Sequence, residues 1–170
     1  MRLLIIGCGR VGATLANIMN KSGHTVTVID LNSDAFERLG ADFEGTTIVG
    51  DGTDEDVLIR AGIEEADAFA AVTNGDNRNI LAAQIAKYTF AVDKVICRIY
   101  DPIRQETYNA LGLESISPTV VGAKLIKTAL LNEAPRTQSV VQSIAEGRGV
   151  PPAAQREKSL TTKAATGENR

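Results

Sequence analysis

The chain has 170 residues, of which 44% are hydrophobic, 23% charged and 4% aromatic, and its formal net charge is −3. This length suffices for one domain with a buried core, and the sequence contains neither the basic stripe nor the aromatic platform typical of nucleic-acid binding. It has no apolar run of the roughly 20 residues needed to span a membrane, and its two cysteines do not suggest a disulfide framework. We therefore expect a soluble, cytoplasmic protein.

Strand and helix patterns alternate along most of the chain. β-branched or apolar runs predict strands, and helical spacing or capping residues predict helices. In chain order, the expected elements are a strand at 3–6, a helix at 11–21, a strand at 25–29, a short helix to 39 capped by Asn32 or Ser33, a strand at 46–49, a helix to 61 capped by Thr53 or Asp54, a strand at 68–72, a helix at 77–87, a strand at 94–98, a helix at 103–110, a short strand at 115–117 and a helix at 119–131.

Near-continuous apolar strands are typical of parallel sheets with helices on both faces. The sequence therefore predicts an α/β fold, a Rossmann-type doubly wound parallel sheet of about six strands with a C-terminal helix and a polar tail. We expect the nucleotide-binding domain to span residues 1–132. Residues 140–144 retain some apolar side chains, but from Gly147 onward Val150 and Leu160 are the only larger aliphatic residues, and such a segment cannot bury enough surface to offset its ordering entropy. Residues 133–170 are expected to form a linker and, from about Glu146, a mobile tail.

A glycine motif directly follows the first predicted strand. Gly7, Gly9 and Gly12 form G-x-G-x-x-G, and Asp30 ends the second strand. In this fingerprint the first glycine permits a tight turn, the second lets a pyrophosphate approach the backbone, and the third lets the helix pack on the strand. The N–H groups at the helix start then face the phosphates, and Asp30 accepts hydrogen bonds from the ribose hydroxyls. The motif predicts nucleotide or dinucleotide binding.

The chain resembles the RCK N-terminal (KTN, TrkA-N) domains, which regulate potassium channels and transporters. The resemblance covers residues 1 to about 132. The matching motifs are Gly7-Cys8-Gly9-Arg10-Val11-Gly12, His24-Thr25-Val26-Thr27-Val28-Ile29-Asp30, Gly50-Asp51-Gly52-Thr53, Ala71-Val72-Thr73-Asn74, residues 77–83 and Cys97-Arg98.

The resemblance implies a set of residues that bind an adenine nucleotide. The set is Gly7, Cys8, Gly9, Arg10, Val11, Gly12, Asp30, Leu31, Asp51, Gly52, Thr53, Thr73, Asn74 and Arg98. Arg10 is similar to the family's arginine that reaches the terminal phosphates of ADP or ATP, which suits a bidentate guanidinium; the alternative is an exposed first-turn arginine. Asp30 argues against NADP, whose 2′-phosphate it would repel, but suits ATP, ADP, NAD and NADH alike.

Three further positions keep two interpretations each. Asp51 and Thr53 resemble residues that flank the adenine, but turn and cap chemistry explains them almost as well. Arg98 ends the fifth strand, where it either contacts a phosphate or a dimer partner or is a solvated strand-end charge.

Thr119 stands where many family members have a glutamate linked to nucleotide and cation contacts, which argues against a divalent-ion role. No metal-ligand cluster is evident.

The motifs without catalytic partners favour a regulator over an enzyme. The one histidine, His24, precedes the second strand, at the wrong end of the sheet for a general acid or base. The expected function is a cytoplasmic, nucleotide-binding regulatory subunit that is held at the inner face of the membrane by a potassium transporter or channel. The alternative is a small NAD-dependent oxidoreductase or an NADH-sensing domain. The resemblance also implies homodimers and rings, commonly octameric, with the apolar helix at 119–131 as a candidate dimer element.

Relatives of this family often continue into a folded C-terminal RCK domain. The 38 or so residues that follow Asn132 are too few and too polar for such a domain. We therefore expect either a minimal regulator or a fragment of a longer protein.

Overall fold

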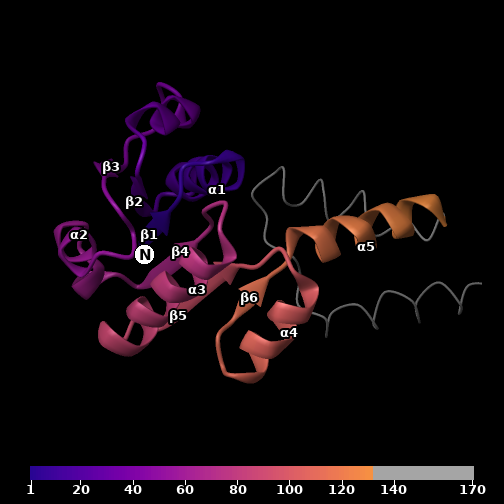
Figure 1. The fold of residues 1–170 in the computed structure, drawn as a ribbon. Coiled ribbons are helices and arrows are strands. Elements are labelled where there is room, and N and C mark those ends of the chain that lie inside the picture. Colours follow the sequence, from indigo (N-terminus) through magenta and orange to yellow (C-terminus); the bar gives the residue numbers. More distant parts are fainter. Residues whose placement is uncertain (132–170) are drawn as a thin grey trace, which may run out of the picture. The chain divides into compact units, whose positions relative to one another are not determined.

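Six parallel strands form one sheet in a computed structural model that describes residues 1–131. Along the sheet the strands follow the order β3-β2-β1-β4-β5-β6 (Figure 1). They are β1 Arg2–Ile6, β2 Thr25–Asp30, β3 Thr46–Val49, β4 Ala68–Ala71, β5 Lys94–Arg98 and β6 Ser115–Ile116. This is the strand order of a dinucleotide-binding fold. The chain places β2 and β3 on one side of β1 and then crosses over to place β4, β5 and β6 on the other side. The predicted Rossmann-type sheet is confirmed.

Helices alternate with the strands along the chain. They are α1 Arg10–Lys21, the 3-10 helix η1 Ser33–Leu39, α2 Glu55–Arg60, the 3-10 helix η2 Ile63–Glu65, α3 Asp76–Gln84, the π-helix η3 Ile85–Thr89, α4 Pro102–Ala110 and α5 Pro118–Leu130. The sheet and the helices that cover it lie in a compact unit comprising Met1–Ile126.

Two hydrophobic clusters fill the two faces of the sheet. On β1, Leu4 and Ile6 belong to the cluster that includes residues of α2 and α3, whereas Leu3 and Ile5 belong to the cluster that includes residues of α1 and η1. Successive side chains of a strand point to opposite faces, so a strand covered on both sides is apolar throughout. Figure 1 shows α1 and α3 on opposite sides of the sheet. The strands of the sequence are therefore apolar without alternation because helices bury both faces of the sheet.

Side-chain caps start three of the short helices. Asn32, Asp54 and Asp101 each accept a hydrogen bond from the backbone N–H two residues later, at 3.0, 2.9 and 2.9 Å. Asp54 is thus the cap of α2, one of the two residues predicted for it. By contrast, α1 and α3 begin after Gly9 and Gly75, which offer no side-chain cap.

Helix α5 has no buried residue. The exposed fractions of its apolar side chains are 47% for Val121, 41% for Leu125, 62% for Ile126 and 77% for Leu130. The sheet of the same chain therefore buries none of these four side chains. None of the helices within residues 1–131 is long and apolar enough to cross a membrane. The predicted linker and tail, residues 133–170, lie outside the described residues.

Candidate functional site

A cavity of about 590 Å³ opens at the carboxyl ends of the central strands, where ligands of doubly wound folds bind. All of the predicted site residues except Gly12 and Thr53 line it. The lining consists of Ile6, Gly7, Cys8, Gly9, Arg10, Val11, Ile29, Asp30, Leu31, Asn32, Ala35, Arg38, Gly50, Asp51, Gly52, Val72, Thr73, Asn74, Arg78, Arg98, Tyr100 and Pro118. The fold thus brings together residues that follow β1, β2, β3, β4 and β5.

The three glycines of the motif have different surroundings. Gly7 has φ +95°, and a Cβ there would lie 2.8 Å from the Thr73 nitrogen, so the turn excludes any side chain. A Cβ at Gly12 would lie 1.8 Å from the Gly7 carbonyl oxygen, which explains the close approach of α1 to the turn. A Cβ at Gly9 would meet no protein atom within 4 Å. Gly7 and Gly12 are therefore required by packing, and Gly9 leaves open space.

The start of α1 is an uncapped helix N-terminus at the cavity. Its N-cap, Gly9, provides no side-chain hydrogen bond, and its first turn contains no acidic residue. The first N–H groups of a helix lack intrahelical partners and carry the positive end of the helix dipole. Arg10, exposed at the first position of α1, adds a cation there. The residues present fit an anionic group such as a pyrophosphate.

Asp30 is fixed by two backbone N–H groups. The Cys8 N–H donates to Oδ2 at 2.6 Å and the Asn32 N–H donates to Oδ1 at 2.9 Å. These bonds tie the end of β2 to the glycine loop. Each carboxylate oxygen can accept about two hydrogen bonds, so Asp30 retains acceptor capacity for a ligand hydroxyl.

Asp51 and Thr53 form a tight turn after β3. The backbone N–H and the hydroxyl of Thr53 donate to Oδ1 of Asp51 at 2.9 and 2.8 Å. These hydrogen bonds, together with the more distant charge of Arg78, lower the pKa of Asp51 below its usual 3.8. Gly52 lies against β1, because a Cβ there would be 2.6 Å from the Ile6 side chain. The turn chemistry expected as an alternative role for Asp51 and Thr53 is therefore present, and Thr53 points to Asp51 rather than lining the cavity.

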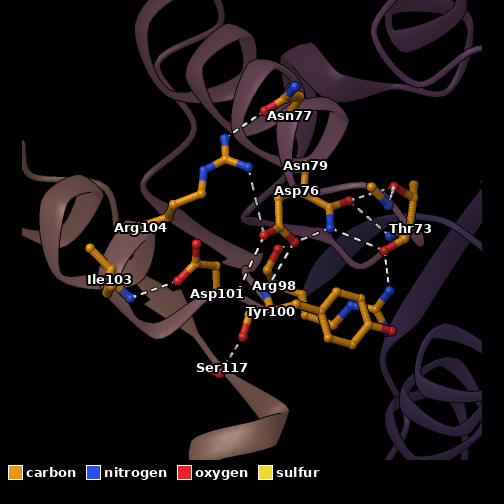
Figure 2. A network of polar contacts seen from close by, with 11 residues as sticks. Thr73, Asp76, Asn77, Asn79, Arg98, Tyr100, Asp101, Ile103, Arg104 and Ser117 are labelled. Atoms are coloured by element: carbon orange, nitrogen blue, oxygen red, sulfur yellow. Dashed lines mark hydrogen bonds and ion pairs between the residues drawn. The ribbon is translucent and has the colours of Figure 1, made fainter.

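Asn79 joins the ends of β4 and β5 (Figure 2). It is fully buried on α3. Its Oδ1 accepts from the Thr73 N–H at 2.8 Å and the Thr73 hydroxyl at 2.7 Å, and its Nδ2 donates to the carbonyls of Thr73 at 3.1 Å and Arg98 at 2.9 Å. All four hydrogen-bonding positions of this amide are thus in use. Asn79 was not among the predicted site residues, although a polar side chain on the buried face of a helix needs such partners.

Arg98 is buried beside the cavity, with only 9% of its surface exposed. Its Nη2 donates to the Thr73 carbonyl, and its guanidinium carbon lies 4.3 Å from the centre of the Tyr100 ring. Its Nε is buried and has no hydrogen-bond partner among residues 1–131. The alternative of a solvated strand-end charge is therefore wrong.

Asp76 holds the turn between β5 and α4. Its carboxylate accepts from the backbone N–H groups of Tyr100 at 2.9 Å and Asp101 at 3.4 Å, and it pairs with Arg104 at 3.8 Å. Arg104 also donates to the Asn77 side chain at 2.5 Å. Figure 2 shows these residues converging from α3, from the β5–α4 turn and from α4, so the backbone of Tyr100 is held in place.

Several lining residues were not among the predicted site residues. Arg38 comes from η1 and Arg78 from α3, and Tyr100 and Pro118 follow β5 and β6. Tyr100 and Pro118 could have been predicted, because ligands of this fold bind beyond the carboxyl ends of the strands. Arg78 lies within the matching motif 77–83, which does not assign it a role, and Arg38 lies outside every motif of the sequence.

Groups suited to catalysis are poorly placed. His24 lies before β2, where its Nδ1 is 3.4 Å from the amino group of Met1, so it is at the opposite end of the sheet from the cavity. Burial, and secondarily the charge of Asp30, raises the pKa of the Cys8 thiol to about 11, which leaves little thiolate at neutral pH. Within residues 1–131, no group of three or more metal-binding side chains is assembled.

The sequence pattern of the TrkA-N domain matches residues 3–118. The chain belongs to the TrkA-N domain family. The Trk system potassium uptake protein TrkA of Streptomyces coelicolor is 51% identical over 117 residues, which is 69% of this chain and 52% of that protein. A TrkA homologue from Pyrococcus abyssi is 38% identical over 108 residues, 64% of this chain and 48% of that protein. The chain thus spans about half the length of the curated relatives that it matches.

Solved structures share the fold of this TrkA-N domain. The AMP-bound Kef CTD of Shewanella denitrificans superposes with a TM-score of 0.69 at 17% identity, covering 97% of this chain and 98% of that one. The GsuK channel bound to NAD gives a TM-score of 0.67 at 22% identity, covering 81% of this chain and 24% of that one. At such identities the likeness concerns the fold alone.

Proposed function

We propose that this TrkA-N domain binds an adenine nucleotide in the cavity and regulates potassium transport by a membrane transporter or channel. The observation that carries the proposal is the uncapped start of α1 beside Asp30, within one cavity at the carboxyl edge of the sheet. The names of the relatives, Trk system potassium uptake proteins, support the transport context. Neighbours of the same fold bound to AMP and NAD support the ligand class.

Different residues of the cavity contact different parts of the nucleotide. The N–H groups that follow Gly9 hold the phosphates, and Arg10 reaches the terminal phosphates. Asp30 accepts from the ribose hydroxyls with the acceptor capacity that Cys8 and Asn32 leave free. Asp51 flanks the adenine, because both of its hydrogen bonds from Thr53 end on Oδ1 and leave Oδ2 for a donor. The remaining members of the set, Val11, Leu31, Gly52, Thr73 and Asn74, complete the walls.

The apolar face of α5, defined by Val121, Leu125, Ile126 and Leu130, serves as a homodimer contact. Four large side chains exposed on one side of a helix form a patch that a single chain leaves in water. A dimer, and rings built from dimers, allow a ligand to act at a distance when it prefers one arrangement of the subunits. The protein would then lie at the cytoplasmic side of the membrane through its partner.

Regulation requires no catalytic group. The one histidine of the sequence is at the far end of the sheet, and Cys8 is protonated at neutral pH. We therefore propose that the domain is not an enzyme. Saturable NADH oxidation with a small carbonyl substrate would contradict this and favour an oxidoreductase.

The first experiment is calorimetric titration of the chain with ATP, ADP, NAD and NADH, with Arg10→Ala as the variant. We expect ATP or ADP to bind and Arg10→Ala to weaken them by about tenfold or more, since a hydrogen bond to a charged group contributes about 1.5–3 kcal/mol. Arg60→Ala is the matched control, because Arg60 is exposed on α2 and does not line the cavity. Absence of binding to all four nucleotides refutes the nucleotide function.

The second experiment tests regulation. Potassium flux is measured in vesicles that contain a Trk-type membrane subunit, with and without the chain and each nucleotide, while ultracentrifugation follows oligomeric state. Ile126→Glu is expected to dissociate the dimer, whereas Lys127→Glu, a change at the next residue that leaves the four apolar side chains in place, is not. A flux that is indifferent to both chain and nucleotide refutes the regulatory proposal.

A further inference from the structure

We infer that Arg78 covers the base of the bound nucleotide, with its planar guanidinium stacked on the face of the ring. This inference rests on the proposed nucleotide function and makes it more specific. In that function the start of α1 and Asp30 hold the phosphates and the ribose, and Asp51 offers an acceptor to the base. The face of the base has no residue assigned to it, and Arg78 was not among the predicted site residues.

The first argument is the place of Arg78 in the cavity wall. Arg78 lines the cavity together with Asp30 and Asp51. It belongs to α3, which follows β4, whereas Asp51 follows β3. The strand order places β2 and β1 between β3 and β4. Arg78 and Asp51 therefore flank the end of β2, where Asp30 takes the ribose, and the base carried by that ribose lies between them.

The second argument is the direction in which the charge of Arg78 acts. The pKa of Asp51 is lowered by the hydrogen bonds from Thr53 and also by the charge of Arg78. Because β3 and β4 are three strand spacings apart, about 14 Å, the Arg78 side chain acts across the part of the cavity that holds the base. The arginine that acts on Cys8 in the glycine loop, whose pKa is raised mainly by burial, is Arg38 instead. Arg78 thus lies on the base side of the ribose rather than on the phosphate side.

The third argument is that the backbone beneath Arg78 is held on both sides. The side chain of Asn77, the preceding residue, accepts a hydrogen bond from Arg104 at 2.5 Å. The following residue, Asn79, is fully buried and bonds to Thr73 and to the carbonyl of Arg98. Figure 2 shows Asn77 and Asn79 within the network at the start of α3. Stacking therefore requires only that the torsions of one side chain become fixed, with no movement of the helix.

The fourth argument is that the guanidinium has no partner on the protein. Within residues 1–131, no carboxylate lies within ion-pair distance of Arg78 and no aromatic ring stacks on it. The side chain is exposed, so both faces of its planar group are free to meet a ring. A guanidinium is delocalised and weakly hydrated and stacks on aromatic faces, and arginines contact nucleic-acid bases in this way.

The test compares ADP with inorganic pyrophosphate, which offers the phosphates without the base. Both are titrated by calorimetry into the full chain and into Arg78→Met, which keeps the length of the stem and loses the planar cation. We expect the affinity for ADP to fall by about two- to thirtyfold, the range of a cation–π contact from exposed to desolvated sites, and the affinity for pyrophosphate to stay the same. Arg60→Met, exposed on α2 and outside the cavity wall, is the matched control.

A second measurement covers the outcome in which pyrophosphate binds too weakly to be measured. In the wild-type chain, the assigned δ-methylene proton resonances of Arg78 are followed by NMR during titration with ADP. A base stacked on the guanidinium shifts these resonances upfield through its ring current. The absence of this shift at saturating ADP, or a loss of pyrophosphate affinity in Arg78→Met as large as the loss of ADP affinity, overturns the inference.

The two proposals fail in different ways. If ADP binds the wild-type chain and Arg78→Met equally well, the nucleotide function stands and the role of Arg78 is refuted. If only NAD or NADH binds, that dinucleotide replaces ADP in both measurements, since it contains the same base and pyrophosphate. If none of ATP, ADP, NAD and NADH binds the wild-type chain, the nucleotide function is refuted and the role of Arg78 with it.

Discussion

Two glycine-to-alanine substitutions in the same loop should separate stability from binding. A Cβ at Gly12 would lie 1.8 Å from the Gly7 carbonyl oxygen, whereas a carbon normally stays about 3.3 Å or more from such an oxygen. Helix α1 must therefore move by about 1.5 Å. Overpacking of this kind costs about 1–3 kcal/mol, and here it meets rigid backbone, so we take the upper value. Alanine regains about 1 kcal/mol as a better helix former, which leaves a net loss of about 2 kcal/mol.

Gly9→Ala is the matched variant. Its Cβ meets nothing within 4 Å, so the expected loss of stability is about 0.5–1 kcal/mol, from placing alanine at the N-cap of α1. The methyl group would nevertheless occupy the space through which a phosphate approaches the helix start. We expect nucleotide affinity to fall by about tenfold or more, which corresponds to about 1.4 kcal/mol.

Urea unfolding gives the stability of both variants, and calorimetry with ATP gives the affinity of those that fold. Gly12→Ala should be the less stable by about 1 kcal/mol or more, and Gly9→Ala should be folded and deficient in binding. A stable Gly12→Ala would show that the packing of α1 on the loop is wrongly described. A Gly9→Ala that binds ATP like the wild type would refute the placement of the phosphates.

Two further predictions concern buried polar groups. Asn79→Leu leaves the Thr73 N–H and the Arg98 carbonyl without partners, so urea unfolding should show a loss of about 3 kcal/mol; a loss below about 1 kcal/mol would contradict the role of Asn79 as the link between β4 and β5. Burial raises the pKa of both Cys8 and Cys97 from 9.0 to about 11. Their contribution to stability is therefore intact below pH 9 and lost between pH 9 and 11, because the unfolded chain releases those protons first. A double Cys→Ala variant should lose less stability over this interval, and parallel curves for the two proteins would disprove the assignment.

The sequence predicts those parts of the fold that depend on local patterns. The strands at 46–49 and 94–98 were predicted with the bounds that the structure has, because β-branched runs ended by polar or glycine residues leave little choice. The π-helix Ile85–Thr89 was not predicted. It follows α3 without a breaker in the sequence, and the chain then turns through Ala91 at φ 51° while the Val92 N–H donates to the Ala86 carbonyl at 3.0 Å. Ala86 and Val92 are buried in the core cluster that includes strand residues, so this ending depends on tertiary packing, which no local pattern predicts.

In the candidate site, too, residues within local motifs were predictable and residues placed by tertiary contacts were not. Gly7, Gly9 and Asp30 belong to a motif whose spacing reflects a local strand–turn–helix geometry, so they were identifiable. The burial of Arg98 was not, because it depends on Thr73 and Tyr100, which reach it from another strand end and from the following turn. Arg38 enters the cavity from a short 3-10 helix, for which no motif exists.

The strand order also has a consequence for how the domain assembles. β1 pairs with β2, its neighbour in the chain, but also with β4, so that Leu3 lies beside both Val26 and Ala68. Pairings distant in the sequence form slowly because they close large loops, and we expect the β1–β4 seam to form late. The cavity draws its walls from both sides of this seam. A ligand bound there would contact residues on both sides of the β1–β4 pairing and would stabilise it against local unfolding. Slower hydrogen exchange of the backbone amides of β4 in the presence of the ligand would show this stabilisation.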